Sequence, residues 1–173
     1  MIVLMASGTG TNFKAIIEDG IKVDLVITNK ENAGISNLAR KLGVKCIVST
    51  ANYESQVPKN TKLVILAGFM RLLSKEFVSK FKVINIHPSL LPSFPGANAI
   101  GQALDAGVKV TGCTVHWADE GMDTGRIIAQ LSCGVFNGDD YTSLSTRIQR
   151  LEHQLYSTVI KELMIKWETK HDK

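Results

Sequence analysis

The sequence predicts an α/β protein with three αβα layers: a Rossmann-like, mostly parallel sheet, a C-terminal antiparallel hairpin and a long C-terminal helix. Three observations support this fold class. Short apolar runs alternate with segments of helical periodicity in the first half of the chain, which is typical of βαβ units. Two longer segments with period-two alternation follow, and a helical apolar stripe closes the chain. We expect residues 1–173 to form a single domain.

The first half contains five predicted strands, each a short and largely apolar run. They are IVLM at 2–5, VDLVIT at 23–28, CIVS at 46–49, LVILAG at 63–68 and VINI at 83–86. A continuous apolar run is expected of a strand that is buried on both faces of a sheet.

Helices are predicted between most of these strands. Phe13, Ile16 and Ile17 mark the first helix, residues 35–42 form a second that ends at Gly43, and SKEFVSKF at 74–81 forms a short third helix. The polar segment 50–61 contains Pro58 and is therefore predicted to be a loop.

The pattern changes in the second half of the chain. Residues 98–106 favour a helix, and the segments 109–117 and 126–136 alternate as two strands of an antiparallel hairpin. In the first strand, Cys113, Val115 and Trp117 share one face, while Thr114 and His116 share the other. A long helix starting at Asp139 or Asp140 carries its apolar stripe at Leu144, Ile148, Leu151, Leu155, Val159 and Leu163.

Composition is that of an ordinary globular protein, with 45% hydrophobic and 21% charged residues. The net charge of +4 is scattered or lies in the tail 166–173 rather than in a basic block, so nucleic-acid binding gains little support. Such a charge suits a small anionic substrate but is common without one. No membrane span is predicted. The apolar start at 1–6 is too short for a signal peptide and is interpreted as a strand, which favours the cytoplasm.

The cysteines show no pattern of paired or metal-binding thiols. Cys46, Cys113 and Cys133 are odd in number, widely spaced and form no CxxC pair. Neither a disulfide framework nor a zinc site is predicted, and we expect these residues to pack as small hydrophobic side chains.

A glycine-rich turn, SGTGTN at 7–12, lies between the first strand and the first helix. Backbone N–H groups and the helix dipole converge there and favour an anion, while Gly8 and Gly10 allow close approach. Ser7, Thr11 and Asn12 offer side-chain hydrogen bonds or a helix cap. The turn lacks the GK[ST] of a Walker loop, and Phe13 replaces the third glycine of a dinucleotide fingerprint. A single phosphate fits better, although an unliganded capped turn remains an alternative.

The segment INIHPSLLPSFPG at 84–96 has the composition of a preformed site. Asn85 and His87 are two residues apart, so on a strand both side chains point to one face. Pro88, Pro92 and Pro95 stiffen the loop that follows. An amide beside an imidazole can donate hydrogen bonds to an oxygen that becomes negative during a reaction. The alternative is a single structural histidine at a strand end.

An acidic loop, ADEGMDTGR at 118–126, joins the two hairpin strands. Asp119 and Glu120 fit a solvated turn, whereas Asp123 can approach His87 if the loop folds over the carboxyl ends of the parallel strands. The carboxylate would then favour the imidazolium and orient the ring. Such a group stabilises the oxyanion of acyl transfer without a nucleophilic side chain. Cys113 is a nucleophile in principle, but it lies on the apolar face of its strand and is predicted to pack.

Five motifs together resemble one known family in order and spacing over nearly the whole chain. They are SGTGTN, LAGFMRLLS at 66–74, INIHPSLLPSFPG, GCTVHWADEGMDTG at 112–125 and QRLEH at 149–153. The chain resembles the phosphoribosylglycinamide formyltransferases (glycinamide ribonucleotide transformylases) of the formyltetrahydrofolate-dependent formyltransferase family. The resemblance implies transfer of a formyl group from 10-formyltetrahydrofolate, a co-substrate, to the glycinamide amine of a phosphoribosyl substrate, without a metal.

The resemblance also implies roles for individual residues. Asn85 and His87 polarise the formyl carbonyl and stabilise the tetrahedral intermediate, while Asp123 favours protonated His87 and helps water-mediated proton transfer. Residues 1–84 would be the phosphate-binding half of the domain and 85–173 the catalytic and folate-binding half. The implied substrate-binding residues are Gly10, Thr11, Asn12, Pro88, Gln149 and Glu152. The implied cofactor-binding residues are Met70, Arg71, Leu72, Leu73, Asn85, Glu120, Gly121 and Met122.

Residue chemistry alone leaves two of these assignments open. Gln149 and Glu152 are three residues apart and off the apolar stripe, as on any exposed helical face. Without the resemblance, Leu72 and Leu73 would be interpreted as core residues. The segment 50–61 also looks shorter than the helical stretch usual in the family, so no role is carried over to it.

Alternative functions remain at this stage. A hydrolase of the same cofactor would use the same three polar groups to direct water, but such enzymes usually carry an extra N-terminal regulatory domain, whereas this chain starts at its first strand. The lack of a C-terminal nucleic-acid domain disfavours formylation of initiator tRNA. A non-catalytic folate or phosphoribosyl sensor would not need His87 or Asp123. We expect small-molecule substrates and a monomer or homodimer.

Overall fold

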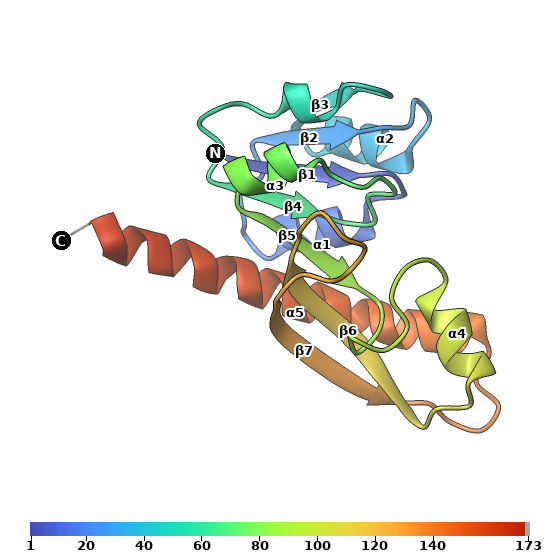
Figure 1. Ribbon diagram of the computed structural model, residues 1–173. Helices are drawn as coiled ribbons and strands as arrows, with labels where there is room; N and C mark the ends of the chain where they lie inside the picture. The colour runs from blue at the N-terminus through green and yellow to red at the C-terminus, as the bar shows by residue number, and fades with distance from the viewer. Residues whose placement is uncertain (172–173) are drawn as a thin grey trace.

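The computed structural model describes residues 1–171, which form one seven-stranded sheet with helices on both faces (Figure 1). The strand order is β3-β2-β1-β4-β5-β6-β7. The strands are β1 (Ile2–Ala6), β2 (Leu25–Thr28), β3 (Lys45–Val48), β4 (Leu63–Leu66), β5 (Val83–His87), β6 (Val110–Trp117) and β7 (Ile127–Gly134). The first five pair in parallel, whereas β5–β6 and β6–β7 are antiparallel. The predicted mixed sheet is confirmed.

The helices follow the predicted order. They are α1 (Thr11–Glu18), α2 (Gly34–Lys41), α3 (Lys75–Lys80), α4 (Ala99–Asp105) and α5 (Tyr141–His171). The segment 50–61 is a loop, as predicted, apart from a short 3₁₀ turn, η1 (Glu54–Gln56). Predicted and observed ends differ by one or two residues at most elements, which is the usual uncertainty of element ends. The helix α5 starts at Tyr141, close to the predicted Asp139 or Asp140, and extends well beyond Leu163, the last residue of its predicted stripe.

Two apolar clusters cover the two faces of the sheet. Side chains alternate along β1, so Leu4 and Ala6 join the cluster under α1, α2, α4 and α5, while Val3 and Met5 join the cluster under α3. All five residues of β1 are buried, as predicted for a central strand. Cys113 belongs to the first cluster and is fully buried, which confirms its packing role. Cys46 and Cys133 are only partly buried, and all three thiols are free.

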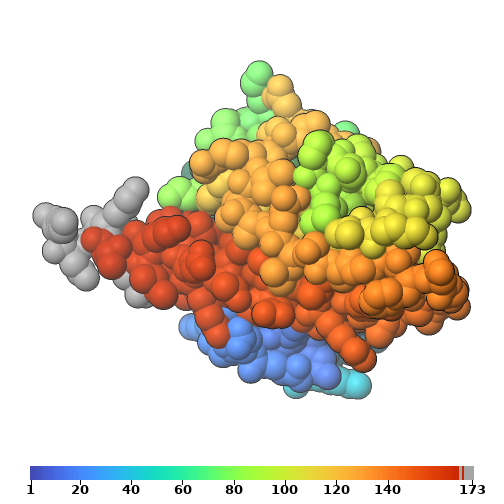
Figure 2. Space-filling view, turned by 90° about the horizontal axis from the view of Figure 1, so that it is seen from below, coloured from blue at the N-terminus to red at the C-terminus, as the bar shows by residue number. Residues whose placement is uncertain are grey.

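The helix α5 begins at a reciprocal cap. Asp140 Oδ1 accepts a hydrogen bond from the N–H of Ser143 at 2.8 Å, and Ser143 Oγ accepts one from the N–H of Asp140 at 3.0 Å. From there the helix lies across one face of the molecule, between the N-terminal half and the β6–β7 hairpin (Figure 2). Its predicted stripe is confirmed at Leu144 and Ile148, which are buried. No helix within residues 1–171 is long and apolar enough to cross a membrane.

Tyr156 connects α5 to two neighbouring strands, β4 and β5. Its hydroxyl group lies 2.7 Å from the carbonyl oxygen of Leu66, at the end of β4, and 3.0 Å from that of Ile84 in β5. The ring is fully buried, so neither carbonyl can exchange this partner for water. Tyr156 therefore fixes the spacing of the two strands that lead into the polar cluster described below.

We expect Tyr156→Phe to lower the free energy of unfolding by about 1–2 kcal/mol, because a buried hydrogen bond is lost while the apolar ring is kept. Urea denaturation would measure the change. Tyr141→Phe is the matched control, since this phenol is 52% exposed and should show no comparable effect. Equal unfolding midpoints for Tyr156→Phe and the unmodified chain would contradict the role assigned to the hydroxyl group.

Candidate active site

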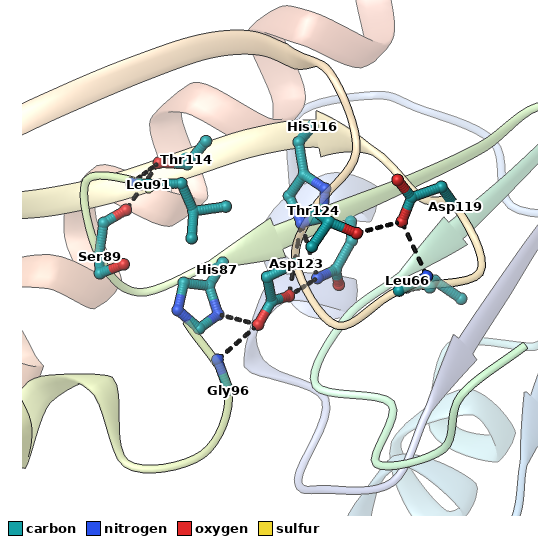
Figure 3. Close-up of polar contacts among 12 residues, drawn as sticks. Leu66, His87, Ser89, Leu91, Gly96, Thr114, His116, Asp119, Asp123 and Thr124 are labelled. Carbon is teal, nitrogen blue, oxygen red and sulfur yellow. Dashed lines mark hydrogen bonds and ion pairs between the residues drawn. The ribbon is translucent and has the colours of Figure 1, made fainter. Parts of the chain in front are cut away.

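The carboxylate of Asp123 is the centre of a buried polar cluster at the end of β5 (Figure 3). Its Oδ2 atom accepts a hydrogen bond from the N–H of Gly96 at 2.8 Å and lies 3.3 Å from Nδ1 of His87. Its Oδ1 atom accepts from Nδ2 of Asn85 at 3.3 Å and lies 3.6 Å from Nε2 of His116. The three side chains predicted to act together are therefore in contact.

The loop 118–126 brings Asp123 to this position. Asp123 has φ +56°, in the left-handed region, which costs a residue other than glycine roughly 1–3 kcal/mol. Asp119 organises the turn, because its Oδ1 atom accepts from the N–H of Gly121 at 3.0 Å and from Oγ1 of Thr124 at 2.8 Å. Asp119 is thus a structural turn residue rather than the freely solvated acid that the sequence suggested.

The ring of His87 lies between two hydrogen-bond acceptors. Its Nε2 atom lies 2.8 Å from the carbonyl oxygen of Phe94, and its Nδ1 atom faces Asp123. A carbonyl oxygen only accepts hydrogen bonds, and so does a carboxylate. Both ring nitrogens of His87 therefore face acceptors. The residue is 5% exposed, so these contacts lie in a poorly hydrated environment.

The sequence missed a fourth member of the cluster, His116 on β6. Its Nε2 atom lies 3.1 Å from Nδ2 of Asn85, and its Nδ1 atom lies 3.0 Å from the carbonyl oxygen of Trp117. A ring with its proton on Nδ1 accepts from Asn85 through Nε2, whereas a ring with a proton on Nε2 donates toward Asp123 and no longer accepts from Asn85. The strand alternation placed His116 on the correct face, but its pairing with Asn85 across β5 and β6 requires the sheet register.

Opposing effects act on the pKa of Asp123. Burial raises the pKa of this carboxyl group, while hydrogen bonding from His116 and from the N–H of Gly96, together with the charge of His87, lowers it. The attractive contacts prevail, so the pKa lies below its usual value. Asp123 is therefore ionised at neutral pH and available to hold a cationic ring.

Thr114 and Gln130 fix the proline loop that follows His87. Thr114 Oγ1 accepts from the N–H of Leu91 at 3.0 Å and donates to the carbonyl oxygen of Ser89 at 2.7 Å. Gln130 Nε2 donates to Thr114 Oγ1 and to the carbonyl oxygen of Leu91, each at 2.9 Å. These contacts hold the loop that presents the Phe94 carbonyl to His87.

A cavity of about 460 Å³ opens beside the cluster. Most of the residues implied to bind cofactor line it, together with the catalytic candidates and Pro88. The predicted residues among its walls are Met70, Arg71, Leu72, Leu73, Asn85, His87, Pro88, Gly121, Met122 and Asp123. Glu120 is not among the lining residues and instead lies 3.5 Å from Nζ of Lys75. The core interpretation is correct for Leu73, which is 7% exposed, and wrong for Leu72, which is 58% exposed.

The glycine turn meets the last helix at the same edge of the sheet. Gln149 Nε2 donates to Thr11 Oγ1 at 3.1 Å, and Asn12 Nδ2 donates to a carboxyl oxygen of Glu152 at 3.4 Å. Gly10 has φ +88° and forms the N-cap of α1 without a side-chain cap. Five of the six implied substrate residues thus gather here, whereas Pro88 lines the cavity beside His87. Ser7 neither caps α1 nor joins this group.

Glu152 is less exposed than the helical pattern suggested. Burial of its carboxyl group raises its pKa to about 7, although the hydrogen bond from Asn12 opposes this. The interpretation of Glu152 as part of an ordinary exposed face is therefore wrong. The turn and Glu152 lie at the carboxyl end of β1, two strands from the carboxyl end of β5, which carries His87.

Cys113 is not an activated nucleophile. Burial, with a further contribution from nearby Glu152, raises the pKa of Cys113 to about 12, so its thiol stays protonated. Within residues 1–171, no group of three His, Cys, Asp or Glu side chains has the arrangement of a metal site. The cluster is suited to stabilising an oxyanion while an external nucleophile attacks a carbonyl carbon. Fold and site together define a group-transfer enzyme of the α/β class.

The comparison with protein families specifies the class. The model described as "Formyl transferase" matches residues 1–160. The chain belongs to the formyl transferase family, and it is an enzyme of that family.

Relatives and solved structures agree with this assignment. The phosphoribosylglycinamide formyltransferase of Bacillus subtilis is 39% identical over 93% of both chains. The trifunctional purine biosynthetic protein adenosine-3 of Homo sapiens is 38% identical over 92% of this chain. This chain spans 18% of that human protein and 14% of its Drosophila melanogaster counterpart. The structure of phosphoribosylglycinamide formyltransferase from Bacillus halodurans has a TM-score of 0.88 at 38% identity, covering 94% of both chains.

Glu152 gives stability a pH dependence. Its pKa is about 7 in the folded chain and near the ordinary 4.5 in the unfolded chain, so the folded chain binds more protons between these values. Stability should therefore fall as pH rises from about 4.5 to about 7. Glu152→Gln should remove this fall, so its stability relative to the unmodified chain should rise by on the order of 2 kcal/mol between pH 5 and pH 8.

Urea unfolding of the unmodified chain and of Glu152→Gln at both pH values would measure the difference. Glu162→Gln, which changes an exposed acid on the same helix, is the matched control. The same pH dependence in Glu152→Gln and in the control would contradict the assigned burial of the Glu152 carboxyl group.

Proposed function

We propose that this chain transfers the formyl group of 10-formyltetrahydrofolate to the glycinamide amine of 5-phosphoribosylglycinamide, a step of de novo purine biosynthesis. The observation that carries the proposal is the contact of Asp123 with both Asn85 and His87 beside the cavity. The formyl transferase match over residues 1–160 and the printed names of the relatives support the same reaction. A cytoplasmic location agrees with such a pathway.

The proposed chemistry is direct attack by the amine on the formyl carbon. The new C–N bond forms, the carbonyl oxygen gains negative charge, and the bond from carbon to N10 of the folate then breaks. Asn85 supplies an N–H donor by exchanging its contact with His116 for that oxygen, and His87, in its protonated form, supplies a positive charge near it. The amine loses one proton and N10 gains one, and Asp123, through an intervening water, is placed to relay it.

The proposed ligand positions follow the two groups of residues. The folate lies against Met70, Arg71, Leu72, Leu73, Asn85, Glu120, Gly121 and Met122. The phosphoribosyl substrate is held by Gly10, Thr11, Asn12, Pro88, Gln149 and Glu152, with its phosphate at the glycine turn. The apolar side chains of the cavity suit a flat heterocycle. Glu120 reaches the folate only if it leaves Lys75, because it stands outside the cavity lining.

Hydrolysis of the same co-substrate is the second candidate, since Asn85, His87 and Asp123 would serve water as well as an amine. The contacts of α5 with the glycine turn favour transfer, because they build a separate polar site at the same sheet edge. A hydrolase has no need of that second site.

Purified protein should consume 10-formyltetrahydrofolate rapidly only when 5-phosphoribosylglycinamide is present, because the amine is the nucleophile. The assay follows release of tetrahydrofolate with and without the amine. Glycinamide riboside, which lacks the phosphate, should show a raised KM if the glycine turn holds that group. Equal consumption of the co-substrate in the absence of any amine would overturn the proposal in favour of hydrolysis.

A further inference from the structure

The loop 67–74, between β4 and α3, forms one wall of the cavity. Met70 and Leu72 project from it and are 69% and 58% exposed, although both are large and apolar. Exposed apolar side chains on a cavity wall are typical of a surface that a ligand covers. Such a wall can receive a ligand without an ordering cost only if its backbone is already fixed.

The first end of this loop is held by Ser7, which directly follows the strand β1. The N–H of Ser7 donates to the carbonyl oxygen of Gly68 at 3.2 Å, and Ser7 Oγ accepts from the N–H of Met70 at 2.9 Å. Ser7 itself is buried and donates to Oδ1 of Asn29 at 2.6 Å. Ser7, at the carboxyl end of β1, thus fixes the start of the wall.

The second end is held by the segment 50–57, to which the sequence assigned no role. Tyr53 donates its hydroxyl hydrogen to the carbonyl oxygen of Leu72 at 3.1 Å, and its ring packs edge-on against Phe69 with centroids 5.1 Å apart. Glu54 accepts from the N–H of Ser74 at 2.7 Å and from Ser74 Oγ at 2.6 Å. Ser74 Oγ also caps α3 by accepting from the N–H of Phe77 at 3.1 Å.

Space behind the wall makes these contacts important. A second cleft, of about 700 Å³, lies on the other side of the loop, and Leu72 and Leu73 line both hollows. Tyr53 and Glu54 are among the residues that line this second cleft. The loop therefore lies between two hollows at Leu72 and Leu73. Leu73 packs into the apolar cluster under α3, whereas the side chain of Leu72 is exposed. The hydrogen bonds from Tyr53 and Glu54 hold the backbone on either side of Leu73.

We propose that Tyr53 and Glu54 are positioning residues for the co-substrate wall, acting through Leu72 and Ser74 without touching the ligand. This inference rests on the proposed function, because it takes formyl-folate to be the ligand of the cavity. Tyr53 fixes the carbonyl of Leu72, and Glu54 fixes Ser74 at the start of α3. Both contacts keep the wall in the position that receives the ligand. Binding of the co-substrate then does not have to order the loop.

Two conservative variants separate positioning from folding. Tyr53→Phe keeps the ring against Phe69 and removes the hydroxyl group, while Glu54→Gln leaves one oxygen acceptor in place of two. Each variant should raise the KM for 10-formyltetrahydrofolate by about threefold to tenfold, the effect of one lost hydrogen bond. The KM for 5-phosphoribosylglycinamide and kcat at saturation should stay within about twofold, since the glycine turn and Asp123 are unaffected.

Glu76→Gln is the matched control, because this acid lines the same cleft and its removal changes the net charge equally. Its kinetic constants should match those of the unmodified enzyme. An unchanged folate KM in both Tyr53→Phe and Glu54→Gln would overturn the proposal, as would equal changes in both substrate KM values. If the unmodified enzyme shows no amine-dependent turnover, the proposed function fails instead. Equilibrium binding of tetrahydrofolate to each variant then tests the wall alone, and unchanged affinity overturns it.

Discussion

The carboxylate of Asp123 ties together segments that are far apart in the sequence. It contacts Asn85 and His87 on β5, the N–H of Gly96 beyond the proline loop, and His116 on β6. A buried carboxylate without these partners would be protonated or driven to solvent. The β6–β7 hairpin, which carries Asp123, and the loop that carries Gly96 therefore stabilise each other's position. The unusual backbone of Asp123 shows that the surrounding structure overcomes a local cost to place this group.

The sheet provides the frame within which this carboxylate works. Parallel strands β1, β4 and β5 end at one edge, so the glycine turn, the loop 67–74 and the Asn85–His87 pair all lie there. The helix α5 contacts that edge from one side through Gln149, Glu152 and Tyr156. One helix thus joins the proposed phosphate turn to the strands that carry the reacting groups.

Local patterns were sufficient to predict much of the fold. The apolar run of β1, the alternation of β6 and the stripe of α5 each have a physical cause that acts within a few residues. The convergence of Asn85, His87 and Asp123 was predicted from strand alternation, from a loop that could fold over the strand ends and from the family resemblance. His116 was missed because its role depends on the register of β5 against β6, which alternation does not specify. Leu72 was misjudged because an apolar side chain that lines a cavity cannot be told from a core side chain by the local sequence.

The central claim is that Asp123 and His87, which are in contact, act as one unit, and a double-mutant cycle on the rate of formyl transfer tests it most directly. His87→Ala and Asp123→Asn should each slow the rate at saturating substrates by about a hundredfold or more, the effect of losing an oxyanion-stabilising group. If the two residues act as one unit, the double variant should be only a few-fold slower than His87→Ala alone. Losses that multiply in the double variant would show that the two residues contribute independently, and would contradict this account.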